Sequence, residues 1–343
     1  MAMHDLGYRS WDAHAPYQKY SWLSISRYGV RLAWKSHWLR RIVFLAFMPV
    51  ALMVGAVFFF EQASNTPAIF PAVVTVVEFL ERNDGQSADG DFQQPYQSMA
   101  DRAVFLRTRD PEKIASYLSE HRPRVWKDIL FFFFKNSQGP TLVILIGMIA
   151  PGLISRDMQS RAFLLYLSRP ITPFQYALGK ATTVWVFVAS VSTIPALAVY
   201  FIGVLFSPNL GVLLNTWDIP LRILLASGVL AIPTTALALC LSSIVHESRY
   251  AGFSWYAIWI VGAVATNILT GIAIAEDPQN ISVFARSAWS WLSLYHVLGI
   301  VEQWVFGLMA KPTDVIPYLT MLVVLTIVCF SILMRRITAP IRI

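Results

Sequence analysis

Three short stretches of the chain bring together residue types that enzymes use, and none completes a catalytic motif. In "FQYALGKAT", residues 174–182, Phe174 occupies the position of the first glycine of a phosphate-binding loop, and Ala181 follows the lysine where that motif has Ser or Thr. In "HESRY", Tyr250 stands where a zinc-protease motif has its second histidine. "GFSWY" lacks the last glycine of the G-x-S-x-G hydrolase motif. We therefore expect no catalytic residue, no metal and no cofactor bound by this chain, and we expect that it is not an enzyme.

The charged residues with the most informative spacing lie in "SRDMQSRAFLLYLSRPITPFQYALGK", residues 155–180, between two apolar runs. Ser155 can cap a short helix, with Asp157 in its first turn, where the helix dipole favours an acid. Pro170 ends that helix. Thr172, with a proline after it and Gln175 three residues on, starts the next helix with a capping box. The pattern predicts a rigid elbow that transmits force; the alternative is an interfacial helix that only anchors the fold.

The elements around this elbow are those of an all-α integral membrane protein. Of the 343 residues, 56% are hydrophobic and 14% are charged, whereas soluble domains carry about a quarter charged residues. A bilayer core needs about 20 apolar residues in a helix. Six runs meet that length and predict six transmembrane helices: 42–60, 136–155, 181–217, 223–245, 250–275 and 315–334.

The cysteine count and the net charge argue against a disulfide-rich protein, a zinc protein and a nucleic-acid-binding protein. Both cysteines, Cys240 and Cys329, lie inside apolar runs, so neither a disulfide framework nor a zinc site is expected. In a membrane protein the net charge of +7 reflects cytoplasmic Lys and Arg, so we expect no nucleic-acid partner.

A seventh apolar stretch, 287–310, contains His296 and Glu302. A carboxylate at the centre of a spanning helix costs about 2.5–3.5 kcal/mol, so this stretch is predicted to be a re-entrant segment before the last span. Ionisable residues at membrane depth are functional candidates. His296 and Glu302 are therefore candidate functional residues; the alternative is that both are solvated at the outer interface.

Topology follows from the distribution of Lys and Arg. Residues 1–41 are predicted to be a basic cytoplasmic N-terminus with an amphipathic interfacial helix that contacts membrane lipid; the alternative is a simple extension of the first span. The first span is 42–60, an extracytoplasmic loop with a helical subdomain covers 61–135, and 136–343 holds spans two to six. Asp110 is expected to cap a helix to about Glu120, with another helix from Pro123. The short loops of the outer face carry only Arg222, Arg286 and Lys311, so both termini are predicted to be cytoplasmic.

The elbow closely resembles the cytoplasmic loop of ABC exporter permeases of the second type. Asp157 matches the acid of the family pattern, and 164–170 matches its L-L-x-x-S/R-P turn. Tyr176, Gly179 and Lys180 match the Y-x-x-G-K sequence that enters the third span. The resemblance implies a coupling helix at about 154–168 and a multi-pass protein of the bacterial inner membrane.

The resemblance also implies the partners. A separate ABC ATPase subunit, in two copies, would hold ATP and Mg, and a second permease copy or homologue would complete the transporter. The expected ATPase contacts are Arg156, Asp157, Arg161, Phe163 and Leu164 on the coupling helix, and His246, Glu247 and Arg249 on the second cytoplasmic loop.

Two other functions stay open at this point. One is an ABC-type accessory component for the assembly of an envelope machine or metalloenzyme, with an extracytoplasmic partner for the long outer loop. The other, less favoured, is an ATP-independent secondary transporter, because no periodic array of intramembrane charges marks an ion relay. The cargo does not follow from the sequence.

Overall fold

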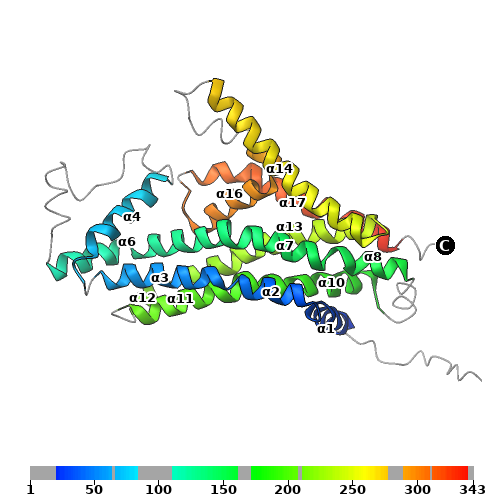
Figure 1. Cartoon of the computed structure of the whole chain (residues 1–343), viewed down its shortest axis with the longest axis horizontal. Coiled ribbons are helices and arrows are strands. Elements are labelled where there is room, and N and C mark those ends of the chain that lie inside the picture. The colour runs from blue at the N-terminus through cyan, green and yellow to red at the C-terminus, as the bar shows by residue number, and fades with distance from the viewer. Residues whose placement is uncertain are drawn as a thin grey trace, which may run out of the picture.

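The described part of the chain is entirely helical. The computed structural model describes residues 21–63, 66–83, 110–160, 171–207, 211–276, 289–309 and 311–338, and no strand occurs among them. In Figure 1 most helices run along the long axis of the molecule, as a bundle of spans requires.

The helices lie as follows. The first half of the chain holds α1 (Ser21–Trp34), α2 (His37–Leu45), α3 (Met48–Gln62), α4 (Phe70–Asn83), α6 (Pro111–Phe132), the π-helix η2 (Phe133–Gln138), α7 (Gly139–Ile149) and α8 (Pro151–Gln159). The second half holds α10 (Pro173–Val188), the π-helix η3 (Ala189–Thr193), α11 (Ile194–Phe206), α12 (Val212–Asn215), α13 (Asp218–Ile244), α14 (Ser248–Glu276), the 3₁₀ turn η4 (Ser290–Leu292), α16 (Leu294–Phe306), the 3₁₀ turn η5 (Pro312–Val315) and α17 (Ile316–Thr338).

All six predicted spans are present. The helices long and apolar enough to cross a membrane cover His37–Gln62, Glu112–Gln159, Pro173–Phe206, Asp218–Ile244, Ser248–Ile272 and Pro312–Thr338. The fold class is confirmed: this is an all-α, multi-pass membrane protein.

The second span extends much further than its apolar run. Asp110 caps α6 as expected, with its carboxylate accepting from the backbone N–H of Glu112 at 3.2 Å. The expected break near Glu120 is wrong, because α6 continues through Pro123 and on through η2 and α7. A proline inside a helix removes one hydrogen bond, and packing of α6 against α3 and α4 holds the helix together across it.

The amphipathic N-terminal helix lies across the ends of the spans. In Figure 1, α1 is seen nearly end-on while the spans run horizontally. It packs on α10 at two glycines: a Cβ on Gly179 would lie 2.8 Å from the Trp22 carbonyl oxygen, and one on Gly29 would lie 2.5 Å from Thr183 Oγ1. Trp34 stacks on Phe187 with ring centroids 5.9 Å apart. Small residues thus fix the position of α1 against the start of the third span.

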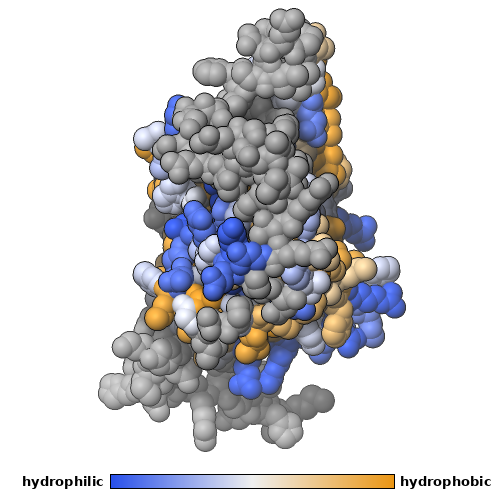
Figure 2. Space-filling view, turned by 90° about the vertical axis from the view of Figure 1, so that its left-hand side faces the viewer, coloured by the Kyte–Doolittle hydropathy of each residue, from blue (hydrophilic) through white to orange (hydrophobic). Residues whose placement is uncertain are grey.

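The far end of the molecule carries a second, smaller core. Phe70 on α4 packs with Ile114 and Leu118 on α6 in a buried cluster separate from that of the spans. Figure 2 looks at this end and shows hydrophilic residues gathered on it, with hydrophobic residues along a flank.

A buried ion pair joins this small core to the first span. Arg122 donates two hydrogen bonds to Glu61, at 2.8 and 2.9 Å, and the Glu61 side chain is only 1% exposed.

Removing one partner of this pair is expected to destabilise the outer end strongly. Arg122→Met removes both hydrogen bonds that the guanidinium donates to the buried Glu61 carboxylate, and breaking a buried ion pair costs about 3–5 kcal/mol. Thermal unfolding of the purified protein in detergent measures the loss. Glu61→Leu/Arg122→Met should recover most of the stability, because it removes both buried charges.

Lys113→Met is the matched control. Its pair with Asp110 is solvent-exposed with a 3.9 Å separation, and such pairs contribute about 0–1 kcal/mol. Equal losses in Arg122→Met and Lys113→Met would contradict this account.

Candidate functional site

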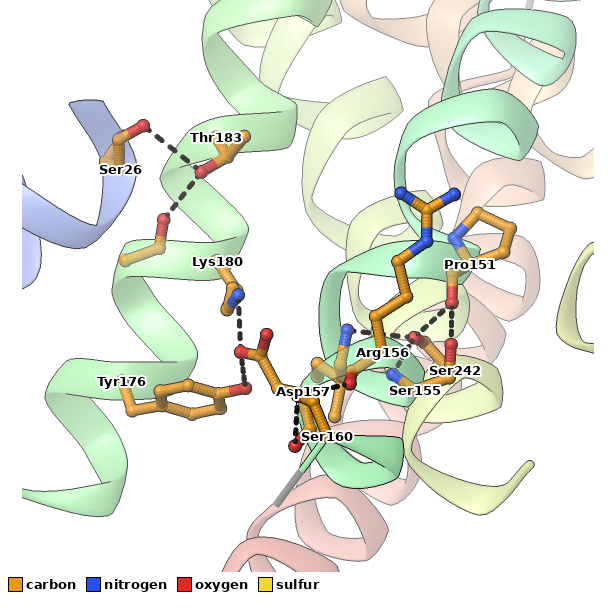
Figure 3. Close-up of polar contacts among 12 residues, drawn as sticks. Ser26, Pro151, Ser155, Arg156, Asp157, Ser160, Tyr176, Lys180, Thr183 and Ser242 are labelled. Atoms are coloured by element: carbon orange, nitrogen blue, oxygen red, sulfur yellow. Dashed lines mark hydrogen bonds and ion pairs between the residues drawn. The ribbon is translucent and has the colours of Figure 1, made fainter. Parts of the chain in front are cut away.

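The elbow between the second and third spans is held by one carboxylate. Asp157 on α8 accepts a hydrogen bond from the Tyr176 hydroxyl at 2.7 Å and forms an ion pair with Lys180, also at 2.7 Å. Both partners lie on α10, as Figure 3 shows. We call these three residues, Asp157, Tyr176 and Lys180, the elbow clamp. The clamp joins the end of one span to the beginning of the next.

A capping box at the start of α10 fixes the part of the helix that carries Tyr176 and Lys180. Thr172 accepts from the backbone N–H of Gln175, whose side chain accepts from the Thr172 N–H, each at 3.2 Å. This is the predicted capping box. Because Tyr176 and Lys180 are four residues apart, they lie on one face of the helix. The Lys180 side chain is 9% exposed and that of Asp157 is 18% exposed, so the pair is largely removed from water.

A serine from the fourth span fixes the other side of α8. The Ser242 hydroxyl oxygen accepts from the backbone N–H groups of Ile154 and Ser155, each at 3.2 Å, and its O–H donates to the Pro151 carbonyl at 2.8 Å. The predicted capping role of Ser155 is wrong. Helix α8 already begins at Pro151, and the Ser155 hydroxyl is buried and bonds to the Pro151 carbonyl.

The predicted ATPase contacts divide into three groups. Arg161, Phe163 and Leu164 lie outside the described residues, as does the rest of 161–170. Asp157 faces α10, and the Arg156 side chain extends away from Asp157 to the level of Pro151 (Figure 3). The third group is exposed to solvent at the turn between α13 and α14, beside α8, and consists of His246, Glu247 and Arg249.

The predicted re-entrant segment, described from Trp289 to Met309, contains a short buried helix. Helix α16 has 13 residues, which span about 20 Å and do not cross a bilayer core. It ends at Gly307, whose φ of 73° is left-handed. It packs against α13, α17, α6 and η2.

Both candidate residues of α16 lie near a lysine of the second span. Glu302 is 1% exposed, and its Oε1 makes no hydrogen bond with the described residues. Burial raises the pKa of Glu302 to about 8, and the Lys135 ammonium opposes this shift. His296 is partly buried and contacts Tyr295 edge to face, and the Tyr295 hydroxyl donates to the Lys135 carbonyl at 2.9 Å. Sequence reasoning missed Lys135 and Tyr295, because only the fold brings Lys135 of η2 beside Tyr295 and Glu302 of α16.

Comparison with known proteins identifies the family. The family model described as "ABC-2 family transporter protein" matches residues 33–336. This chain belongs to the ABC-2 transporter family. No curated protein and no solved structure matches it.

In this ABC-2 family chain, the motif residues have physical roles. Tyr176 and Lys180 bind Asp157, and Gly179 allows α1 to approach α10. Among the described residues no group of three or more His, Cys, Asp and Glu side chains could hold a metal ion. The contacts of the elbow clamp position α8 against α10.

A charge swap tests whether the clamp acts as a pair. Asp157→Lys places two cations together and should lower the melting temperature, as should Lys180→Asp. The double variant Asp157→Lys/Lys180→Asp restores opposite charges and should be more stable than the two losses predict, with a coupling energy of about 1 kcal/mol or more. The measurement is thermal unfolding of all four proteins in one detergent. Strictly additive losses would show that the two side chains do not act together.

Proposed function

We propose that this chain is the transmembrane permease subunit of an ATP-driven exporter. It couples ATP hydrolysis by a separate nucleotide-binding subunit to the movement of substrate across the membrane. Family membership supports the permease assignment. The observation that carries the coupling is the elbow clamp, which ties α8 to α10 while Ser242 ties α8 to α13.

The geometry supports a mechanical role for α8. A push on α8 acts on α7, with which it is nearly continuous, and on α10 and α13 through polar contacts. In the proposed assembly two ATPase subunits, each with ATP and Mg, act on two permease chains. Closure of the ATPases then moves three spans of each permease together.

The proposed docking surface follows from the exposed groups at this end. Because Asp157 is engaged within the chain, its contribution is to hold α8 in place. The proposed contacts with the ATPase subunit are made by His246, Glu247 and Arg249. The residues predicted from the sequence, Arg161, Phe163 and Leu164, complete this docking surface. Both termini and this surface are proposed to be cytoplasmic, in a bacterial inner membrane.

A specific observation favours a second candidate function. Helices α4 and α6 form their own small core at the opposite end, joined to the first span by Glu61 and Arg122. A defined structure at that end suits a protein partner outside the membrane, as an ABC-type accessory component of envelope or metalloenzyme assembly would need.

Co-purification tests the exporter proposal. A tagged protein extracted in mild detergent should bring down an ATPase subunit with a phosphate-binding loop. Glu247→Lys/Leu164→Asp should remove most of that subunit, because it reverses a charge and places a carboxylate at an apolar contact. Mass spectrometry identifies the subunit, and ATPase activity of the eluate quantifies it.

Lys311→Glu is the control, since it reverses a charge at an exposed position before α17 on the predicted outer face. It should leave the ATPase bound. A folded wild-type protein that brings down no such subunit would contradict the proposal and favour an ATP-independent transporter. A stable extracytoplasmic protein in the same eluate would favour the assembly role.

A further inference from the structure

A crevice opens between the N-terminal helices and the elbow. One wall is a stripe of α1 that continues into the turn and α2, and the other wall is the end of α7 and the start of α8. Its lining from α1 to α2 is Gly29, Leu32, Ala33, Ser36 and Leu39, and from α7 and α8 it is Met148, Ile149, Gly152, Leu153 and Arg156.

The crevice exists because α1 is held by a different helix. Gly29 packs against Thr183 of α10, so α1 is fixed there and not on α7. The chain then turns at Ser36, which caps α2 by accepting from the backbone N–H of Leu39 at 3.4 Å. Large apolar side chains remain exposed along the walls: Leu32 is 48% exposed and Met148 is 40% exposed.

Among the described residues that line this space, one side chain is charged, that of Arg156. Arg156 is exposed, and its guanidinium has no hydrogen-bond or ion-pair partner among the described residues. Its side chain lies over Gly152, where an added Cβ would be 3.0 Å from Arg156 Nε. The missing side chain of Gly152 therefore leaves room for Arg156 to turn back toward the membrane spans. Figure 3 shows that the Arg156 side chain points away from Asp157 and from the C-terminal end of α8.

The electrostatic surroundings favour an anion at this level. Residues 21–45 contain no Asp or Glu but carry Arg27, Arg31, Lys35, Arg40 and Arg41. Trp38, 67% exposed, lies beneath the Arg41 guanidinium at 5.3 Å. Cations with exposed tryptophans are typical of helices at the headgroup level, where anionic lipid is attracted.

We propose that this crevice binds one anionic phospholipid. Its phosphate lies on Arg156, with the Ser36 hydroxyl within the same space, and an acyl chain lies against Leu39, Met148 and Ile149. Arginine is well suited to phosphate because its N–H donors form a planar fork. The lipid then fills the gap between α1 and α8 and holds the elbow at the membrane surface. This proposal does not depend on the direction of transport or on the cargo.

Lipid retention measured by native mass spectrometry tests the proposal. The protein is reconstituted in nanodiscs of phosphatidylglycerol and phosphatidylcholine in equal parts and then released into detergent. The wild type should keep one phosphatidylglycerol per chain. Arg156→Gln should lower that occupancy about tenfold, the size expected for one charge-assisted phosphate contact.

Two further variants separate the site from general charge attraction. Ala33→Phe fills the crevice from α1 without changing any charge, and it should also lose the lipid. Arg336→Gln removes an exposed cation near the C-terminal end of α17 and should keep it. Melting temperatures in lipid-free detergent verify that each variant is folded, and Ala33→Phe carries the test if Arg156→Gln does not fold.

Several outcomes would overturn the proposal. One is equal retention of phosphatidylglycerol by the wild type and both crevice variants. Another is retention of phosphatidylcholine as strongly as phosphatidylglycerol. Displacement of the lipid by millimolar inorganic phosphate would identify a simple anion site. Unchanged retention with a loss of co-purifying subunit in Ala33→Phe would show that a protein fills the crevice.

Discussion

The arrangement of the spans around the elbow depends on the buried ion pair between Lys180 and Asp157. Lys180 lies on the third span with a side chain that is 9% exposed, and an ammonium there is costly to bury without a counter-charge. Asp157 supplies that charge from a different element, and Tyr176 donates to the same carboxylate oxygen. A buried ion pair adds little net stability compared with apolar packing, but separating it is expensive. The pair therefore fixes where α8 lies, and α8 cannot leave α10 without exposing or stranding a charge.

The six spans differ in how much of their surface is buried, and this indicates which spans a movement of α8 would affect first. In the most apolar windows of the second, third and fourth spans, 50–61% of residues are buried, whereas the figure is 17% for the first and fifth spans and 22% for the sixth. The first group forms the core of the bundle, and α8 is bonded to it through Asp157 and Ser242. Figure 1 shows α14 diverging from the bundle beyond its start near α8. At that start, Trp255 and Tyr256 bond to carbonyls of α7, and Gly147 leaves no room for a Cβ beside them. Under the proposed coupling, force on the elbow would reach the core first and the outer spans through their ends.

Much of this could be predicted from sequence, because the signals are local. Apolar length located all six spans, and the caps at Asp110 and Thr172 act over two and three residues. The Ser155 cap was wrong because α8 already begins at Pro151, so Ser155 lies inside the helix and its hydroxyl donates to the Pro151 carbonyl. The motif lysine, Lys180, was recognised by resemblance, but its bond to Asp157 needed the fold. Lys135 carried no local signal at all, since its neighbours Tyr295 and Glu302 come from a distant segment.

Irregular backbone in the second and third spans links the elbow to the buried carboxyl group. The π-helices η2 and η3 contact each other, and π segments are frequent at functional sites because they free backbone carbonyls. In η2 the Lys135 carbonyl accepts from Tyr295, while the Gln138 amide donates across to the Ala46 carbonyl at 3.2 Å. The second span, Glu112–Gln159, thus begins at the small outer core, packs against α16 at η2 and ends in α8. Because a helix is stiff along its axis, the displacement of α8 that we propose would act on η2, which lies in the same span. Glu302 lies near Lys135 of η2, so under the proposed coupling a movement of α8 would also change the surroundings of this carboxyl group.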